Sequence, residues 1–142
     1  MVYITRKENF CAAHKLSIDK WTDAKNQQTF GKCANKNWHG HNYELIVTVK
    51  GIPDKETGFV MDLSQLSRII QRQIIRKVDH KNFNLDVGFM KGIMPTTENI
   101  TVSIFNELKK YLKKAKLHSV RLVETGKNSV EYFGEQKFSK IQ

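Results

Sequence analysis

The sequence predicts an α+β fold in which helices pack on one face of an antiparallel sheet. Alternating apolar residues indicate strands near both ends of the chain, and two segments between them have the three- and four-residue spacing of helices. The expected order is three strands, two helices and two further strands. Because no repeat, low-complexity tract or linker rich in Pro, Gly or Ser interrupts this pattern, we expect a single domain over residues 1–142.

The first half of the chain contains the clearest strand, over residues 43–49, where every second residue is apolar. An N-terminal strand is predicted through residues 10–14. Residues 53–58 have the composition of a turn. The apolar run 59–61 that comes next is expected to return as a hairpin partner.

Helical spacing begins at Leu63 and continues to Lys77, which predicts a core-facing helix of about four turns. A second helix is expected after Pro95 and runs to Leu112, followed by lysines that complement the helix dipole. The last elements are strands over 120–124 and 130–133.

A turn-prone segment joins these two last strands into a second hairpin. A sheet built in this way has open edges, which invite pairing with other chains. We therefore expect the protein to form an oligomer.

The composition favours a soluble, cytoplasmic protein with an anionic ligand. The sequence has 24 basic and 14 acidic residues, and the resulting net charge of +10 attracts anions such as phosphate esters. No apolar run is long enough to span a membrane, and residues 1–7 do not resemble a secretory signal, so no membrane partner is expected. The charge also suits a nucleic-acid binder. However, Tyr43 and Phe105 fall on core-facing positions, which leaves no stacking platform, and no nucleic-acid partner is expected.

The sharpest local feature is His39-Gly40-His41. In an extended segment, residues two apart point to the same side, so both imidazoles can converge on one ion. His14 on a neighbouring strand would add a third ligand, and three imidazoles with an open fourth position are typical of catalytic zinc. The alternatives are a surface turn for the pair and, for His14, a buried ring bonded to a carbonyl group.

Cys33 lies in a segment rich in Gly and Asn, with five residues between it and His39. Beside Lys32 and a metal, its thiol would have a lowered pKa and could act as a nucleophile or general base. Alternatively, Cys33 is a fourth zinc ligand in a closed structural site, or a free thiol. Cys11, within the strand pattern, is expected to be a small buried side chain.

Three further groups allow two interpretations each. Asp79-His80 could be a carboxylate-oriented imidazole that moves protons, or simply the end of the first helix. The segment 96–99 is a helix start that could also hold an anion. Glu124 ends a strand, and its carboxylate could accept paired hydrogen bonds from a planar ligand.

Taken together, the order and spacing of several fragments resemble those of the 6-pyruvoyl tetrahydropterin synthase family. Besides His14 after Phe10-Cys11-Ala12-Ala13, the fragments are Phe30-Gly31-Lys32-Cys33, His39-Gly40-His41-Asn42-Tyr43, Thr57-Gly58-Phe59-Val60-Met61-Asp62, Asp79-His80-Lys81-Asn82, Thr96-Thr97-Glu98-Asn99 and Glu124-Thr125.

This resemblance implies a T-fold, an antiparallel four-stranded sheet carrying two helices, and a homohexamer made of two trimers with active sites between subunits. It also implies zinc held by three histidines and magnesium bound with a triphosphate, although the sequence indicates no separate magnesium site. The implied roles are metal ligands for His14, His39 and His41; general base for Cys33; proton relay for Asp79 and His80; pterin anchor for Glu124; and nearby substrate contacts for Thr96, Thr97 and Glu98.

The implied activity is that of a carbon–oxygen lyase, which converts 7,8-dihydroneopterin triphosphate to 6-pyruvoyl tetrahydropterin and eliminates triphosphate. A related branch, 6-carboxytetrahydropterin synthase, uses the same substrate in deazapurine synthesis. That branch has a shorter gap between the cysteine and the His-Gly-His, so the five residues here favour the pyruvoyl enzyme. Trp38 stands where the pyruvoyl family often has a small residue, which could alter substrate access.

Overall fold

Two long strands form the centre of the fold, β1 (Val2–His14) and β2 (His39–Gly51). In the computed structural model, which describes residues 1–135, they pair antiparallel along their whole length, from Val2 opposite Gly51 to His14 opposite His39. Both predicted strands are therefore confirmed, and both are longer than the apolar alternation alone indicated. The domain predicted over 1–142 includes residues 136–142, which lie outside the described part.

The remaining strands complete a sheet with the order β3-β1-β2-β4-β5. The predicted C-terminal hairpin is confirmed as β4 (Lys116–Thr125) and β5 (Asn128–Tyr132), with β4 antiparallel to β2. The extra strand relative to the four-stranded sheet that the resemblance implies is β3 (Lys81–Asn82), which pairs parallel to the end of β1. Two residues are too short a run to leave a recognisable sequence pattern.

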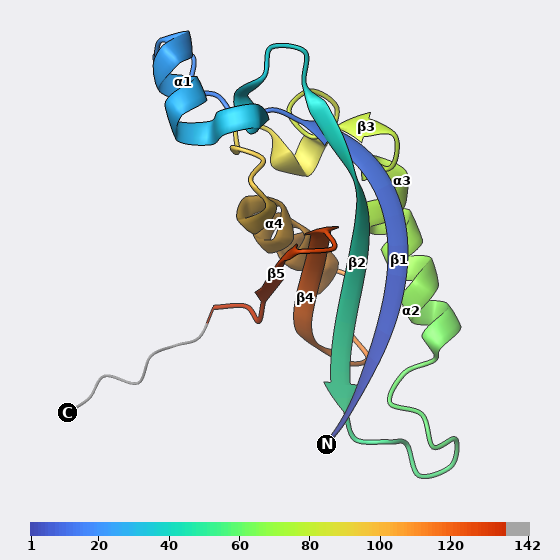
Figure 1. Cartoon of the computed structure of the whole chain (residues 1–142). Coiled ribbons are helices and arrows are strands. Elements are labelled where there is room, and N and C mark those ends of the chain that lie inside the picture. Colours follow the sequence, from blue (N-terminus) through green and yellow to red (C-terminus); the bar gives the residue numbers. More distant parts are fainter. Residues whose placement is uncertain (136–142) are drawn as a thin grey trace, which may run out of the picture.

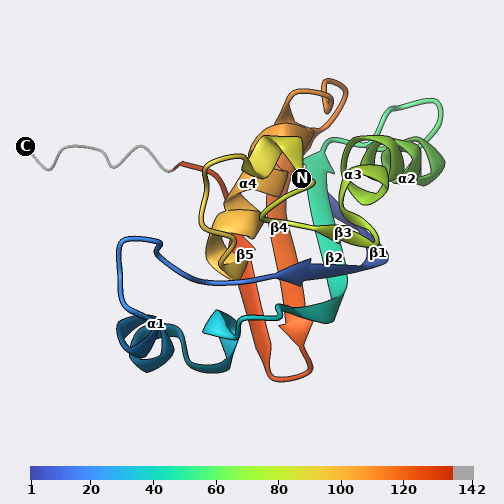
Figure 2. The same cartoon turned by 90° about the horizontal axis from the view of Figure 1, so that it is seen from above.

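Two helical segments cover one face of this sheet, as predicted (Figures 1 and 2). The first begins as α2 (Leu63–Ile70), widens into a π-helical segment (Gln71–Ile75) and ends as α3 (Arg76–Val78). The second is α4 (Thr97–Lys109), which ends three residues before the predicted Leu112. None of the helices within residues 1–135 is long and apolar enough to cross a membrane.

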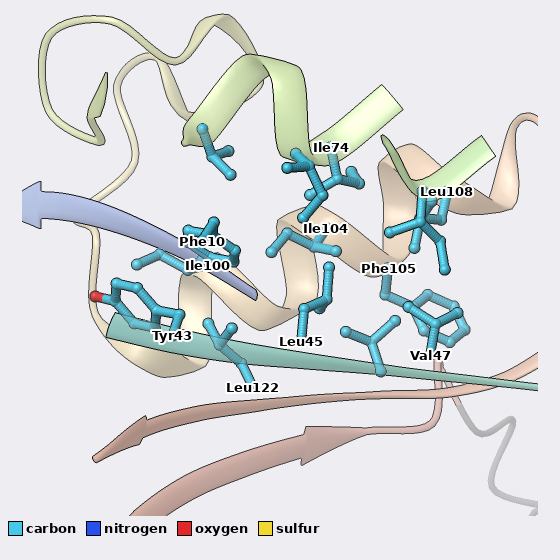
Figure 3. Packing of buried hydrophobic residues seen from close by; sticks show 14 of the residues in the cluster. Phe10, Tyr43, Leu45, Val47, Ile74, Ile100, Ile104, Phe105, Leu108 and Leu122 are labelled. Atoms are coloured by element: carbon cyan, nitrogen blue, oxygen red, sulfur yellow. The ribbon is translucent and has the colours of Figure 1, made fainter. Parts of the chain in front are cut away.

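The core lies between this face of the sheet and the helices (Figure 3). The apolar residues at alternate positions of β2 are all buried there, and the stacked rings of Phe10 and Tyr43, with centroids 4.9 Å apart, close one end of the core. The largest fully buried side chains include apolar residues of β2, α2, the π-helical segment, α4 and β4, together with two from the segments between α3 and α4: Leu45, Leu66, Ile70, Ile74, Ile100, Ile104, Leu108, Leu122, Phe83 and Met90.

One expectation for the connecting segments is wrong. Residues 59–61 form no strand, because Asp54 closes a turn by accepting hydrogen bonds from the Thr57 amide and hydroxyl groups, and the chain then passes directly into α2. Phe59 is 61% exposed.

A helix that was not predicted, α1 (Asp23–Phe30), lies at the periphery of the fold (Figure 1). It has no apolar stripe, and its identifiable signal is the N-cap Thr22, whose side chain accepts from the Lys25 amide.

Glu8 joins β1 to the first helical segment. Its carboxylate accepts hydrogen bonds from the Ser67 hydroxyl and the side-chain amide of Gln71, each 2.8 Å long. It also accepts one from Nε of Arg6 on its own strand. Burial raises the pKa of the carboxyl group, but these hydrogen bonds and the Arg6 charge outweigh that effect and lower the pKa below its usual 4.5.

We expect Glu8→Gln to lower the free energy of unfolding at pH 7 by about 1 kcal/mol, because the charge-assisted bonds are lost. Since the folded pKa is lowered, the wild-type advantage is present above pH 4.5 and disappears as the pH falls through the folded pKa. Urea unfolding of both proteins across this range measures the difference. A constant difference down to the lowest pH would contradict the assignment.

Candidate metal centre and surrounding site

The three predicted histidines meet at one end of the β1–β2 pair. His14 ends β1, His39 begins β2 opposite it, and His41 lies two residues further on the same side of the strand. The Nε2 atom of His14 lies 3.0 Å from Nε2 of His39 and 3.2 Å from Nε2 of His41. Ligands about 2.0–2.1 Å from a tetrahedral zinc ion are about 3.3 Å apart, so this arrangement fits a zinc-sized cation.

The orientation of His14 supports the same conclusion. This residue is buried, and its Nδ1 lies 2.8 Å from the carbonyl oxygen of Pro95, just before α4. A neutral imidazole that donates from Nδ1 has its lone pair on Nε2, which is the atom that faces the other two rings. The carbonyl-bonded histidine and the metal ligand, which the sequence left as alternatives, are therefore compatible descriptions of one residue.

The electrostatics of the cluster keep the rings neutral. Burial is the largest cause that lowers the pKa of His14, His39 and His41, whereas the charge of Glu124 opposes the shift. Neutral imidazoles are the form that binds metal. Within residues 1–135, Nδ1 of His39 is buried without a hydrogen-bond partner, whereas Glu124 Oε1 lies 3.8 Å from Nε2 of His41.

Gly40 allows the histidine strand to lie close to β1. A Cβ atom at this position would lie 2.9 Å from the carbonyl oxygen of Ala12, which is a backbone atom that cannot move aside cheaply. The lack of a side chain at Gly40 therefore permits the close approach of the two strands. It places His39 and His41 at the distance from β1 at which they meet His14.

The predicted pterin-binding residues gather beside α4 and β4. The Thr97 hydroxyl donates a hydrogen bond to Oε2 of Glu124, and both residues line a cavity of about 470 Å³ together with Glu98 and Lys127. Thr96 has a different position, because its hydroxyl is the N-cap of α4 and accepts from the Asn99 amide at 3.2 Å.

Cys33 lies in a 3₁₀ turn (Gly31–Ala34), half-buried and near enough to Glu124 to feel its charge. Burial and this carboxylate raise the pKa of the thiol, whereas proximity to Lys32 was expected to lower it. The basic neighbour in the sequence is therefore not the dominant influence. The backbone of Cys33 is fixed by the Leu16 amide, which donates to the Cys33 carbonyl at 2.8 Å.

Asp79 and His80 form a separate group at the edge of the sheet. They come directly after α3, as expected for a helix end, and the Nδ1 atom of His80 lies 3.1 Å from Oδ2 of Asp79. The third member of the group is Cys11, which is half-buried rather than buried as predicted. Within the described residues, the chain therefore brings the three histidines together beside Glu124, places Cys33 where the charge of Glu124 acts on it, and holds Asp79 and His80 in a second cluster with Cys11.

Sequence reasoning assigned Tyr43 only to the core, but its ring also lies beside the histidine cluster, with centroids 5.6 Å from His41 and 6.5 Å from His14. The ring is buried, and within residues 1–135 the hydroxyl has no hydrogen-bond partner. Figure 3 shows its oxygen pointing away from the packed apolar cluster. Burial, followed by the charges of Glu124 and Cys33, raises the pKa of this group, so it remains a neutral donor. Strand periodicity indicates which face Tyr43 occupies but does not indicate that its hydroxyl is a buried donor without a partner.

Comparisons with known proteins agree with this geometry. A model of the 6-pyruvoyl tetrahydropterin synthase family matches residues 3–135. The 6-pyruvoyl tetrahydrobiopterin synthase of Pongo abelii is 42% identical over 132 residues, which cover 93% of this chain and 91% of that protein. The solved 6-pyruvoyl tetrahydropterin synthase of Caenorhabditis elegans is 39% identical, has a TM-score of 0.88, and the match covers 94% and 96% of the two chains.

A relative from another branch is also similar. The putative 6-carboxy-5,6,7,8-tetrahydropterin synthase of Archaeoglobus fulgidus is 37% identical over 116 residues, or 82% of each chain. The structural likeness identifies the fold as the expected T-fold.

We expect Gly40→Ala to weaken metal binding by about tenfold and to destabilise the protein by about 1–3 kcal/mol, because the added methyl group forces β1 and β2 apart. Gly88→Ala is a matched control, since a Cβ there would meet nothing within 4 Å. Zinc titration against a competing chelator measures the affinity of each variant. Equal affinities for the two variants would show that the close approach does not position the histidines.

Proposed function

Because the chain belongs to the 6-pyruvoyl tetrahydropterin synthase family, we propose that it converts 7,8-dihydroneopterin triphosphate to 6-pyruvoyl tetrahydropterin and eliminates triphosphate, in tetrahydrobiopterin synthesis. It would then be a carbon–oxygen lyase. The observation that carries the proposal is the convergence of three neutral imidazoles beside a carboxylate, whose charge also acts on the thiol of Cys33.

We propose that His14, His39 and His41 hold Zn²⁺ and leave a coordination position for substrate. When bound, zinc supplies a Lewis acid that lowers the pKa of hydroxyl groups and of the C–H bonds next to them. Magnesium would bind with the triphosphate group of the substrate. The net charge of +10 favours the approach of this anion.

Glu124 is suited to orient the flat pterin ring. Its carboxylate can accept two parallel hydrogen bonds from neighbouring ring N–H groups. The Thr97 hydroxyl donates to one of its oxygens and thereby fixes its direction. Glu98 shares the cavity, and Thr96 contributes by fixing the start of α4 rather than by direct contact through its capping hydroxyl.

Cys33 would act as the general base on the substrate side chain. Its raised pKa means that the thiol keeps its proton until positive charge gathers at the histidine cluster, which favours the thiolate. Proton removal is then confined to the loaded site. Tyr43, a neutral buried hydroxyl, can donate a hydrogen bond to oxygen atoms of the bound ligand.

Asp79 and His80 would complete the site as its proton relay. The Asp79 carboxylate fixes the ring of His80, which is exposed and free to accept protons. Since this pair is separate from the histidine cluster in one chain, we propose that it serves the site of a neighbouring subunit in a homohexamer of two trimers. The edge positions of β3 and β5 support such assembly.

Incubation of the purified protein with dihydroneopterin triphosphate and mass analysis of the pterin product tests the proposed reaction. We expect a three-carbon diketo side chain. A one-carbon carboxylate would instead assign the chain to the 6-carboxytetrahydropterin branch, to which the Archaeoglobus fulgidus relative is assigned by name.

The variants Cys33→Ala and His39→Ala separate a catalytic site from a closed structural one. We expect Cys33→Ala to keep zinc and to lose at least about a hundredfold in turnover, which is the usual effect of removing a general base. His39→Ala should lose both zinc and turnover. Zinc content by elemental analysis and steady-state rates are the measurements, and loss of zinc in Cys33→Ala would make the cysteine a ligand.

A further inference from the structure

A second cluster of metal-binding groups lies outside the histidine site, at the junction of β1, α3 and β3. One ligand atom each from Cys11, Asp79 and His80 lies within 4.8 Å of the others. Strand alternation separates it from the histidine site: Phe10, Ala12 and His14 are buried on the core side of β1, so Cys11 projects from the opposite side.

Backbone hydrogen bonds fix these three groups relative to one another. The His80 amide donates to the Cys11 carbonyl at 2.7 Å, and the Cys11 amide donates to Oδ1 of Asp79 at 3.0 Å. Parallel pairing of β3 with Ala12 and Ala13 continues the same contact. The cluster is therefore built into the sheet edge, and its geometry does not depend on a chance meeting of flexible surface side chains.

The chemistry of the group matches a borderline divalent cation. A thiolate, a carboxylate and an imidazole are the ligand types that zinc takes in proteins, and three of them leave one position for solvent or a further ligand. Cys11 and His80 line a cavity of about 470 Å³, which gives an ion access to the cluster. The other titratable residues that line this cavity are His41 of the histidine site, one lysine, Lys81, and one acid, Asp86, and the charges of the last two oppose each other.

We propose that Cys11, Asp79 and His80 form a second metal site, which binds Zn²⁺ or an ion of similar chemistry. Binding releases one proton to solvent, from the thiol of Cys11. The neutral ring of His80 binds through Nδ1, next to Asp79, after its proton moves to Nε2. The cation then takes the place of the proton between Asp79 and His80.

This site gives the metal a second effect on the enzyme. An ion bound at Nδ1 leaves the proton of the ring on Nε2, so His80 has no free lone pair with which to accept a proton, and zinc in excess of the histidine site would inhibit turnover. This consequence rests on the proposed function, because it needs Asp79 and His80 as the relay. The binding of the ion itself does not rest on the proposed function.

The test is the zinc content of the full chain after equilibration with buffered Zn²⁺, together with the absorption spectrum of the cobalt-loaded protein. We expect two zinc ions per wild-type chain and one per chain in Cys11→Ser, which keeps the histidine site. The cobalt protein should show a sulfur-to-metal charge-transfer band that is absent in Cys11→Ser and present in Cys33→Ser.

One zinc per wild-type chain, or a charge-transfer band that survives in Cys11→Ser, would overturn the proposal. Loss of the band in Cys33→Ser alone would also do so, because it would assign the thiolate to the other cluster. If Cys11→Ser does not fold, the zinc content of Asp79→Asn and the charge-transfer band of the cobalt-loaded wild-type protein decide the same question. Because none of these readouts needs substrate, a failed reaction assay and a failed second site remain distinguishable.

Discussion

The antiparallel register between β1 and β2 is the constraint on which the rest of the site depends. It places His14 opposite His39 and brings Ala12 opposite His41, so that three rings project from two adjacent strands to one point. Gly40 allows the strands to approach at this end, because any larger residue would press against the Ala12 carbonyl. A shift of the register by one residue would turn the two β2 histidines to the opposite face.

The same end of the fold connects the candidate metal centre to the cavity lined by Glu124. His14 bonds to the Pro95 carbonyl, and the next two residues provide the cap of α4 and the hydroxyl that holds Glu124. A single turn of chain therefore links the ring that orients the ion to the carboxylate suited to orient the pterin. Rigid coupling of this kind is needed in a site where bond breaking depends on placement within fractions of an ångström.

The sequence allowed prediction of those features that depend on local pattern. Alternation revealed β2, helical spacing revealed α2 and α4, and His-Gly-His spacing identified a pair of rings on one side of a strand. The features that it could not reveal depend on contacts between distant segments. The two residues of β3 are extended because β1 pairs with them, and periodicity gave the side on which Cys11 lies but not the neighbours it meets there.

The π-helical segment between α2 and α3 sets the angle at which the chain leaves the first helical segment. An α-helix turns by about 100° per residue, so one residue more or fewer before Val78 would rotate the helix exit by more than a quarter of a circle. The wider turn at Gln71–Ile75 accommodates an extra residue while Ile70, Ile74 and Val78 all remain buried. The π-helical segment thus corrects the rotation of the helix end. Glu8 bonds to its first residue, Gln71, and Asp79, which follows the helix, reaches the sheet edge at Cys11.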